Sequence, residues 1–190
     1  MSARVFSSEA GLAGFFRRRA RHERAGFQLY TAAVTAARDP YLYVTLGVPD
    51  TLDGRFDSVA LHAYLVIRRL NMAPPPGAEL AQAVFDAMFS DMDVNLREMG
   101  VSDMSVGKRN RAMWEAFHGR SVAYAAAWAD GEQLAEAIAR NVWRGQEAPA
   151  GSPDALVRLV RAQAECLAEQ PLEALLRGEI TFIPAEEAAR

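Results

Sequence analysis

Residues 55–71, RFDSVALHAYLVIRRLN, decide the fold class of this 190-residue chain. Their apolar side chains recur every three or four positions, which is the spacing of one face of an α-helix. That face comprises Phe56, Val59, Ala60, Ala63, Ile67 and Leu70. Further apolar side chains at Leu61, Tyr64 and Leu65 widen the surface beyond one face, which is typical of a helix surrounded by others. The stretch therefore predicts the central helix of a bundle.

The remaining chain shows the same periodicity, interrupted by residues that end helices. Asp39-Pro40 ends one helix because the residue before proline disfavours the helical region, and Gly100 is placed to cap another. We expect helices over residues 9–18, 22–37, 41–46, 78–99, 104–128, 131–143, 154–169 and 172–177, with an extended piece at 180–183. Strand alternation between hairpin turns is missing. The sequence thus predicts an all-α, single-domain helical bundle of about six to eight helices with no significant β-sheet.

Composition and charge exclude several classes of protein. The chain is 51% hydrophobic and 24% charged, an ordinary globular balance, and no run reaches the roughly 18 apolar residues of a membrane-spanning helix. Residues 1–30 carry six arginines against Glu9 and Glu23, although the whole chain has a net charge of −3. A nucleic-acid reader usually has a strongly basic domain, so we expect no sequence-specific nucleic-acid binding. Cys166 is the single cysteine, which rules out an internal disulfide and indicates a reducing compartment.

The basic N-terminus predicts a contact with anionic lipid. Aromatic and arginine side chains are interleaved there, as in amphipathic helices that lie on a membrane surface. The residues concerned are Phe15, Phe16, Arg17, Arg18, Arg19 and Arg21. A helix packed on the bundle, or a frayed end, explains the same residues equally well.

We divide the chain into a basic segment (1–27), a helical domain (28–183) and a C-terminal tail (184–190).

Familiar catalytic and metal-binding motifs fail in their details. Gly107-Lys108 lacks the glycine spacing and the following Ser or Thr of a phosphate loop. The run that starts at Asp91 lacks the glycine and glutamate of a calcium loop. Glu115 and His118 form one Glu-x-x-His sequence, whereas a di-iron bundle needs two. We accordingly expect no catalytic residue, no metal and no cofactor, and a protein that is not an enzyme.

Two charged sets remain as candidates for a partner-binding surface, with structural ion pairs as the alternative. One is acidic and lies before and within the two middle helices, and the other is basic and follows it along the chain. Opposite charges on neighbouring helices can steer and orient a docking partner. The residues we select are Asp50, Asp53, Asp91, Asp93, Arg97, Lys108, Arg109 and Arg120.

Four stretches in the middle of the chain resemble the ubiquinol–cytochrome c chaperone family. They are LGVPDTLDGRFD (46–57), FDAMFSDMDVNLREMGV (85–101), SVGKR (105–109) and FHGR (117–120), and the likeness extends over residues 28–178. His118 departs from the family pattern, where an aromatic such as tyrosine is expected. The resemblance implies an all-helical chaperone for cytochrome b, the membrane-embedded subunit of the ubiquinol–cytochrome c reductase complex (complex III).

The expected partner is therefore cytochrome b or its nascent chain, with a second assembly factor as a further candidate. The expected location is the cytoplasmic side of the inner membrane in a bacterium, peripheral to the bilayer, or the matrix side in a mitochondrion. A groove for the client would be lined by adaptable apolar side chains. Candidates are Met88, Met92, Met113, Trp114 and Phe117, with packing in the core as the favoured alternative for each. No small-molecule ligand is expected. The first rival hypothesis is a helical pocket for a lipid or a quinone, and the second is a metal-dependent enzyme that uses Glu115, His118, Asp91 and Asp93.

Overall fold

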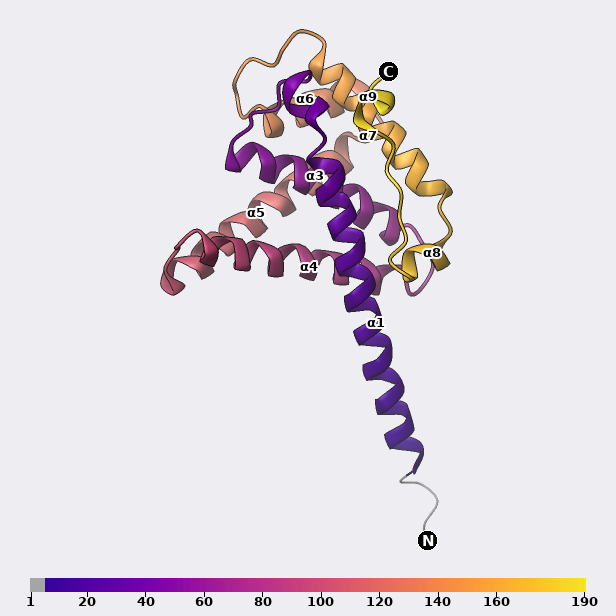
Figure 1. Ribbon diagram of the computed structural model, residues 1–190. Helices are drawn as coiled ribbons and strands as arrows, with labels where there is room; N and C mark the ends of the chain where they lie inside the picture. The colour runs from indigo at the N-terminus through magenta and orange to yellow at the C-terminus, as the bar shows by residue number, and fades with distance from the viewer. Residues whose placement is uncertain (1–5) are drawn as a thin grey trace.

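A computed structural model describes the backbone of residues 6–190 and the side chains from Arg17 onward. Within these residues the chain forms helices and no strand, which confirms the predicted all-α fold (Figure 1). The helices are α1 (Phe6–Ala37), α2 (Pro40–Val44), α3 (Leu52–Asn71), α4 (Gly77–Glu98), α5 (Asp103–Ala127), α6 (Gly131–Val142), α7 (Ser152–Glu169), α8 (Leu172–Leu176) and α9 (Ala185–Ala188).

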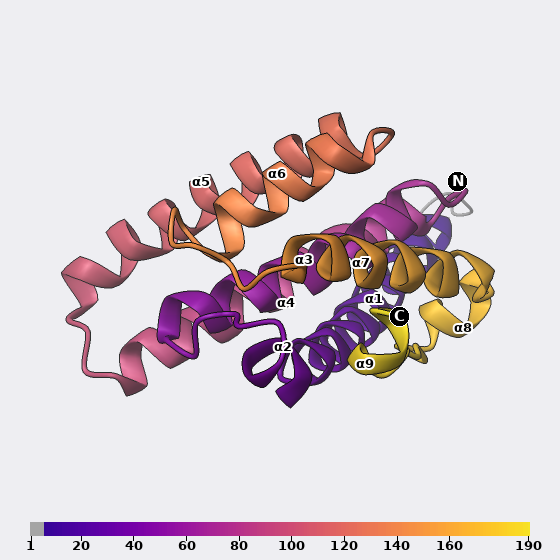
Figure 2. The same cartoon turned by 90° about the horizontal axis from the view of Figure 1, so that it is seen from above.

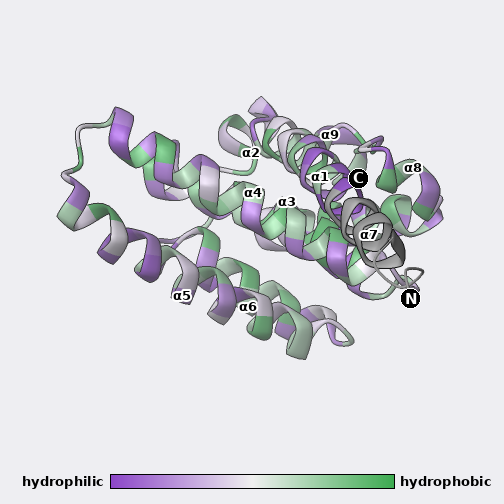
Figure 3. Ribbon diagram, turned by 90° about the horizontal axis from the view of Figure 1, so that it is seen from below, coloured by the Kyte–Doolittle hydropathy of each residue, from purple (hydrophilic) through white to green (hydrophobic). Residues whose placement is uncertain are grey.

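Helix α3 lies at the centre, as its sequence predicts. It packs against α1, α4, α6 and α7, and Leu61, Leu65 and Leu70 are buried among them. Thr51 starts the helix, because its hydroxyl accepts a hydrogen bond of 3.1 Å from the backbone N–H of Gly54. Seen from above, α5 and α6 form a layer on one side of α3, and α7 to α9 lie nearer its other side (Figure 2). Hydrophobic and hydrophilic residues are mixed along both α4 and α5 (Figure 3), but α4 buries nine of its residues and α5 only four.

Helix α1 corrects the prediction of two helices over residues 9–18 and 22–37. It is one continuous helix of 32 residues, because Arg19, Ala20 and Arg21 between the expected pieces all favour helix. Its C-terminal half packs against α3 and α4, and Gly26 allows a close approach to the backbone of Ala83 in α4. Its N-terminal half projects beyond the body of the molecule (Figure 1).

The last residues are joined to the body by α9. Ala185, Ala188 and Ala189 are buried, and α9 packs against α7. The Asp39 carboxylate, at the end of α1, accepts a hydrogen bond of 3.0 Å from the backbone N–H of Ala185. Arg158 of α7 donates to the carbonyl of Ala189 at 2.9 Å. Residues 184–190, expected to form a tail, thus close the bundle over the end of α1.

Candidate functional site

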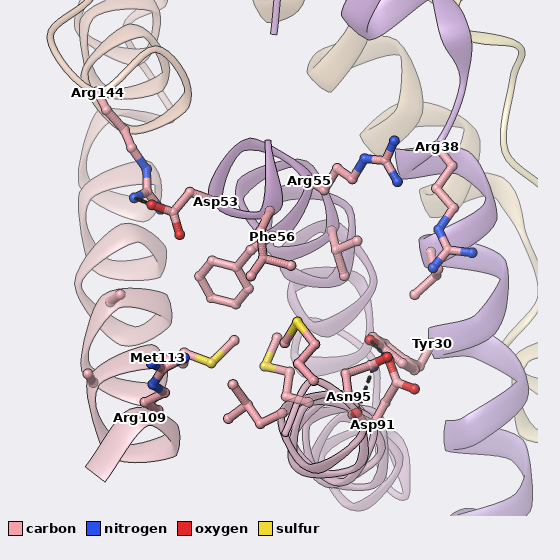
Figure 4. Close-up of a pocket in the computed structure, with 18 residues that line it drawn as sticks. Tyr30, Arg38, Asp53, Arg55, Phe56, Asp91, Asn95, Arg109, Met113 and Arg144 are labelled. Carbon is pink, nitrogen blue, oxygen red and sulfur yellow. Dashed lines mark hydrogen bonds and ion pairs between the residues drawn. The ribbon is translucent and has the colours of Figure 1, made fainter. Parts of the chain in front are cut away.

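An open cavity of about 480 Å³ lies between α1, α3, α4 and α5 (Figure 4). Its wall is mainly apolar, and Met92, Met99 and Met113 contribute three flexible thioether side chains. Phe56 and Val59 of α3 complete this lining. Volumes of this order are typical of sites that bind small molecules or a few protruding side chains. Methionine adapts its shape to varied apolar partners, so such a wall can accommodate apolar groups of more than one shape.

A buried ion-pair network holds one end of this cavity together. Asp57 of α3 is 1% exposed and forms two ion pairs. Its partners are Arg120 of α5 at 2.6 Å and Arg144, which follows α6, also at 2.6 Å. Arg144 also contacts Asp53 at 2.7 Å, and it adopts a positive φ of 51°. Burial raises the pKa of Asp57 above its ordinary value, and the two guanidinium groups oppose that rise. The network therefore joins the α5–α6 layer to α3 at the side of the pocket.

A second, more exposed network fixes the connection between α4 and α5. Asp93 accepts hydrogen bonds from Arg97 at 2.6 Å and from Asn110 at 2.8 Å. Arg97 also pairs with Asp103 at the start of α5. The hydrogen bond from Arg97 lowers the pKa of the Asp93 carboxyl. These contacts set the position of α5, and with it the opposite wall of the cavity.

The wall formed by α1 and α4 contains a polar contact between Tyr30 and Asp91. The Tyr30 hydroxyl donates to the Asp91 carboxylate at 2.8 Å. A tyrosine hydroxyl is protonated at neutral pH and can donate, and burial beside Asp91 raises the pKa of the Tyr30 hydroxyl further. The bond ties the two helices together where both line the cavity (Figure 4).

The structure brings three of the eight selected partner-binding residues to the cavity: Asp53, Asp91 and Arg109. The other five are placed elsewhere. Asp50 forms an exposed pair with Arg55 at 2.6 Å, which lowers the pKa of its carboxyl, and Lys108 is exposed on α5 outside the cavity. The remaining three, Asp93, Arg97 and Arg120, belong to the two ion-pair networks.

Tyr30 and Arg38 line the cavity but escaped the sequence-based selection. With Val34 they recur at intervals of four residues along α1, so they share one face of that helix. This spacing could have indicated that the three residues act together, although it does not reveal which helix their shared face contacts.

The residues predicted to contact a membrane surface lie on α1. Arg17, Arg18, Arg19 and Arg21 are exposed, and the side chains of Phe15 and Phe16 lie outside the described residues.

Of the five side chains expected to line a groove, two line the cavity and three lie outside it. Met92 and Met113 line the cavity, and Met92 is also largely buried, whereas Met88 and Phe117 are buried in the core away from the cavity. Trp114 lies outside the cavity and stacks on His118, with ring centroids 5.3 Å apart and planes 4° apart. All five lie on helices that border the site, and the rotation of each helix decides which residues face the opening.

The Glu115-x-x-His118 sequence shows no sign of a metal centre. Glu115 accepts a hydrogen bond from Arg111 at 3.0 Å. Among the described residues, no group of three or more His, Cys, Asp or Glu side chains is placed to hold a metal ion. Within the same part of the chain, no helix is both long and apolar enough to cross a membrane.

Comparison with known proteins identifies the family of this fold. The family model described as ubiquinol–cytochrome c chaperone matches residues 44–182, a range that contains α3 to α8 and most of the cavity wall. The chain belongs to this family. Among solved structures, the crystal structure of the Cbp3 homolog from Brucella abortus is similar to this chain, with 34% sequence identity and a TM-score of 0.79. The match covers 93% of this chain and 98% of that one.

Curated animal proteins also resemble this chaperone-family chain. Ubiquinol-cytochrome-c reductase complex assembly factor 1 of Xenopus laevis is 26% identical over 165 residues, covering 86% of this chain and 82% of the relative. The Homo sapiens protein of that name is 24% identical over 165 residues, and the match spans only 55% of its length. The family membership predicted from four sequence stretches is thus confirmed, and the relatives connect the fold with assembly of the reductase complex.

Proposed function

We propose that this protein is a non-enzymatic assembly chaperone that binds newly made cytochrome b and promotes assembly of the ubiquinol–cytochrome c reductase complex. The observation that carries the proposal is the open, methionine-rich cavity between four helices of a ubiquinol–cytochrome c chaperone fold. A membrane-embedded client exposes apolar side chains before it is inserted and assembled, and such side chains need a temporary apolar partner. The cavity offers this partner, with charged side chains around it to orient the client.

Recovery of pulse-labelled cytochrome b with the tagged protein tests this function. Translation products are labelled briefly, membranes are solubilised gently, and bound proteins are identified by mass spectrometry. We expect cytochrome b to be enriched above other apolar membrane proteins and to decline during the chase as the complex forms. Equal recovery of unrelated membrane proteins would argue for non-specific apolar binding instead.

A pocket for a lipid or a quinone is the competing function, because either ligand also has an apolar tail. Native mass spectrometry of the purified protein separates the two functions. The chaperone hypothesis predicts the mass of the polypeptide alone, and addition of quinone leaves that mass unchanged. A bound species of lipid size that quinone displaces would support the competing function.

We also propose that the protein works at the membrane surface, held there by the projecting half of α1. Arg18 and Arg21 are exposed on this half, and a basic helix is attracted to anionic lipid. Each arginine near such a surface contributes about 1 kcal/mol. The location follows from this attraction and needs no membrane-spanning helix.

Reversing both of these charges is expected to weaken vesicle binding. Arg18→Glu/Arg21→Glu should reduce co-sedimentation with phosphatidylserine-containing vesicles at least about tenfold, because two attractive charges become repulsive. Arg111→Glu/Arg140→Glu makes the same change in net charge on exposed residues of α5 and α6, and should retain binding. Equal loss in both variants, or equal binding of the wild type to neutral vesicles, would contradict the role of α1.

A further inference from the structure

The charged residues around the cavity differ in sign from the protein as a whole. Four arginines and two aspartates line it, which gives a formal charge of +2, whereas the whole chain has −3. Both aspartates already have partners, since Asp53 pairs with Arg144 and Asp91 accepts the Tyr30 hydroxyl. Of the arginines, Arg144 is held by Asp53 and Asp57, and Arg55 is held by Asp50 at 2.6 Å.

Two arginines of the cavity remain without such contacts. Among the described residues, neither Arg38 nor Arg109 has a side-chain hydrogen bond or an ion pair. Arg38 follows the end of α1 and Arg109 lies on α5, so the two occupy opposite sides of the opening (Figure 4). Between them lie the apolar side chains of Phe56 and Met113. The cavity therefore has an apolar centre with an unpaired cation on each side.

From this arrangement we infer that the cavity recognises a short apolar polypeptide segment with a carboxylate on each side of its apolar residues. The guanidinium group is planar and matches a carboxylate through two parallel hydrogen bonds, so Arg38 and Arg109 would each receive one acidic side chain. The inference rests on the proposed function, because it specifies which segments of a client the chaperone selects.

Other occupants satisfy fewer of these groups. A neutral quinone supplies no carboxylate for either arginine, and a phospholipid presents its anionic groups at one end only. A cavity of about 480 Å³ also limits how much can enter at once. A few apolar side chains of one helical turn fit that volume, whereas a whole membrane-spanning helix of about 20 residues does not. The segment would thus be held at one point along its length, between its acidic residues.

Peptide binding tests the inference directly. The probes are two fluorescein-labelled helical peptides with the same Leu, Met and Phe centre, one flanked by Asp at both ends and the other by Lys. Fluorescence anisotropy at low salt should give the Asp-flanked peptide at least tenfold higher affinity for the wild type. In Arg38→Glu/Arg109→Glu the preference should invert toward the Lys-flanked peptide. Both arginines are exposed and unpaired, so the variant should fold normally by circular dichroism.

Arg111→Glu/Arg140→Glu is the matched control, with the same change in net charge on residues outside the cavity. It should keep the preference for the Asp-flanked peptide. Inversion in the control as well, or an unchanged preference in Arg38→Glu/Arg109→Glu, would overturn the inference. The wild type's recovery of cytochrome b is scored separately. If that recovery succeeds while the peptide preference does not depend on Arg38 and Arg109, the inference fails and the chaperone function stands.

Discussion

Replacing Arg120 and Arg144 together by methionine is expected to lower the free energy of unfolding by about 3–5 kcal/mol at pH 7. Asp57 is 1% exposed, and these two residues are its ion-pair partners. Without them the carboxylate would stay buried with no opposite charge, which is far more costly than the loss of an exposed pair. Urea unfolding followed by circular dichroism measures the difference.

Two further variants separate the buried charge from lost packing. Adding Asp57→Leu to the double variant removes the unpaired carboxylate and should restore most of the lost stability. Arg111→Met/Arg177→Met removes two arginines from exposed pairs and should leave the unfolding free energy unchanged within error. A double variant as stable as the control would show that Asp57 is not held by these arginines.

The same variants should differ in their dependence on pH. Burial raises the pKa of Asp57 in the folded protein, so the folded state holds this proton more tightly than the unfolded chain. The contribution of Asp57 to stability is therefore fully present below the ordinary carboxyl pKa and declines as the pH rises through the raised pKa. Removal of both arginines raises that pKa further, so the stability lost at pH 7 should be partly recovered in acid.

The second large effect concerns capture of the client. Met99→Glu is expected to reduce recovery of pulse-labelled cytochrome b at least tenfold, equivalent to about 1.4 kcal/mol of binding free energy. Met99 lines the cavity and is 50% exposed, so the substitution puts a charge where apolar side chains should enter without opening the core.

Met104→Glu provides the matched control for this variant. Met104 is 95% exposed and lies on α5 outside the cavity. Met104→Glu should recover as much cytochrome b as the wild type. The unfolding midpoints of Met99→Glu and Met104→Glu should both equal that of the wild type. If both substitutions reduce recovery equally, the client contacts a broader surface than the cavity.

Periodicity alone was enough to predict the fold class and the central helix, because residues 59–67 in the middle of α3 are almost all apolar. Helix ends were harder to place. Arg19, Ala20 and Arg21 connect residues 9–18 to 22–37 and all favour helix, so no local signal supported the break that we expected there. The expected tail likewise contains α9, which is buried against α7 and α2 and bonded to Asp39, all of them earlier in the chain.

Only part of the candidate site could be predicted, for a related reason. The pair of Asp93 and Arg97 follows from their spacing of four residues on one helix. Asp57 and Arg120 are 63 positions apart, and no spacing rule joins them. Met88 and Met92 share one helix face and both are buried, yet only Met92 also lines the cavity. Tertiary packing decides both outcomes.

Site-specific photo-crosslinking during translation tests the central claim, that newly made cytochrome b occupies the cavity. A photoreactive phenylalanine is placed at Ala112, an exposed residue of α5 that lines the cavity, or at Ala125, an exposed residue of the same helix outside it. The cavity site predicts a crosslink to cytochrome b from position 112 and none from position 125. Crosslinks from position 125 alone, or from neither position while cytochrome b is still recovered with the protein, would contradict it.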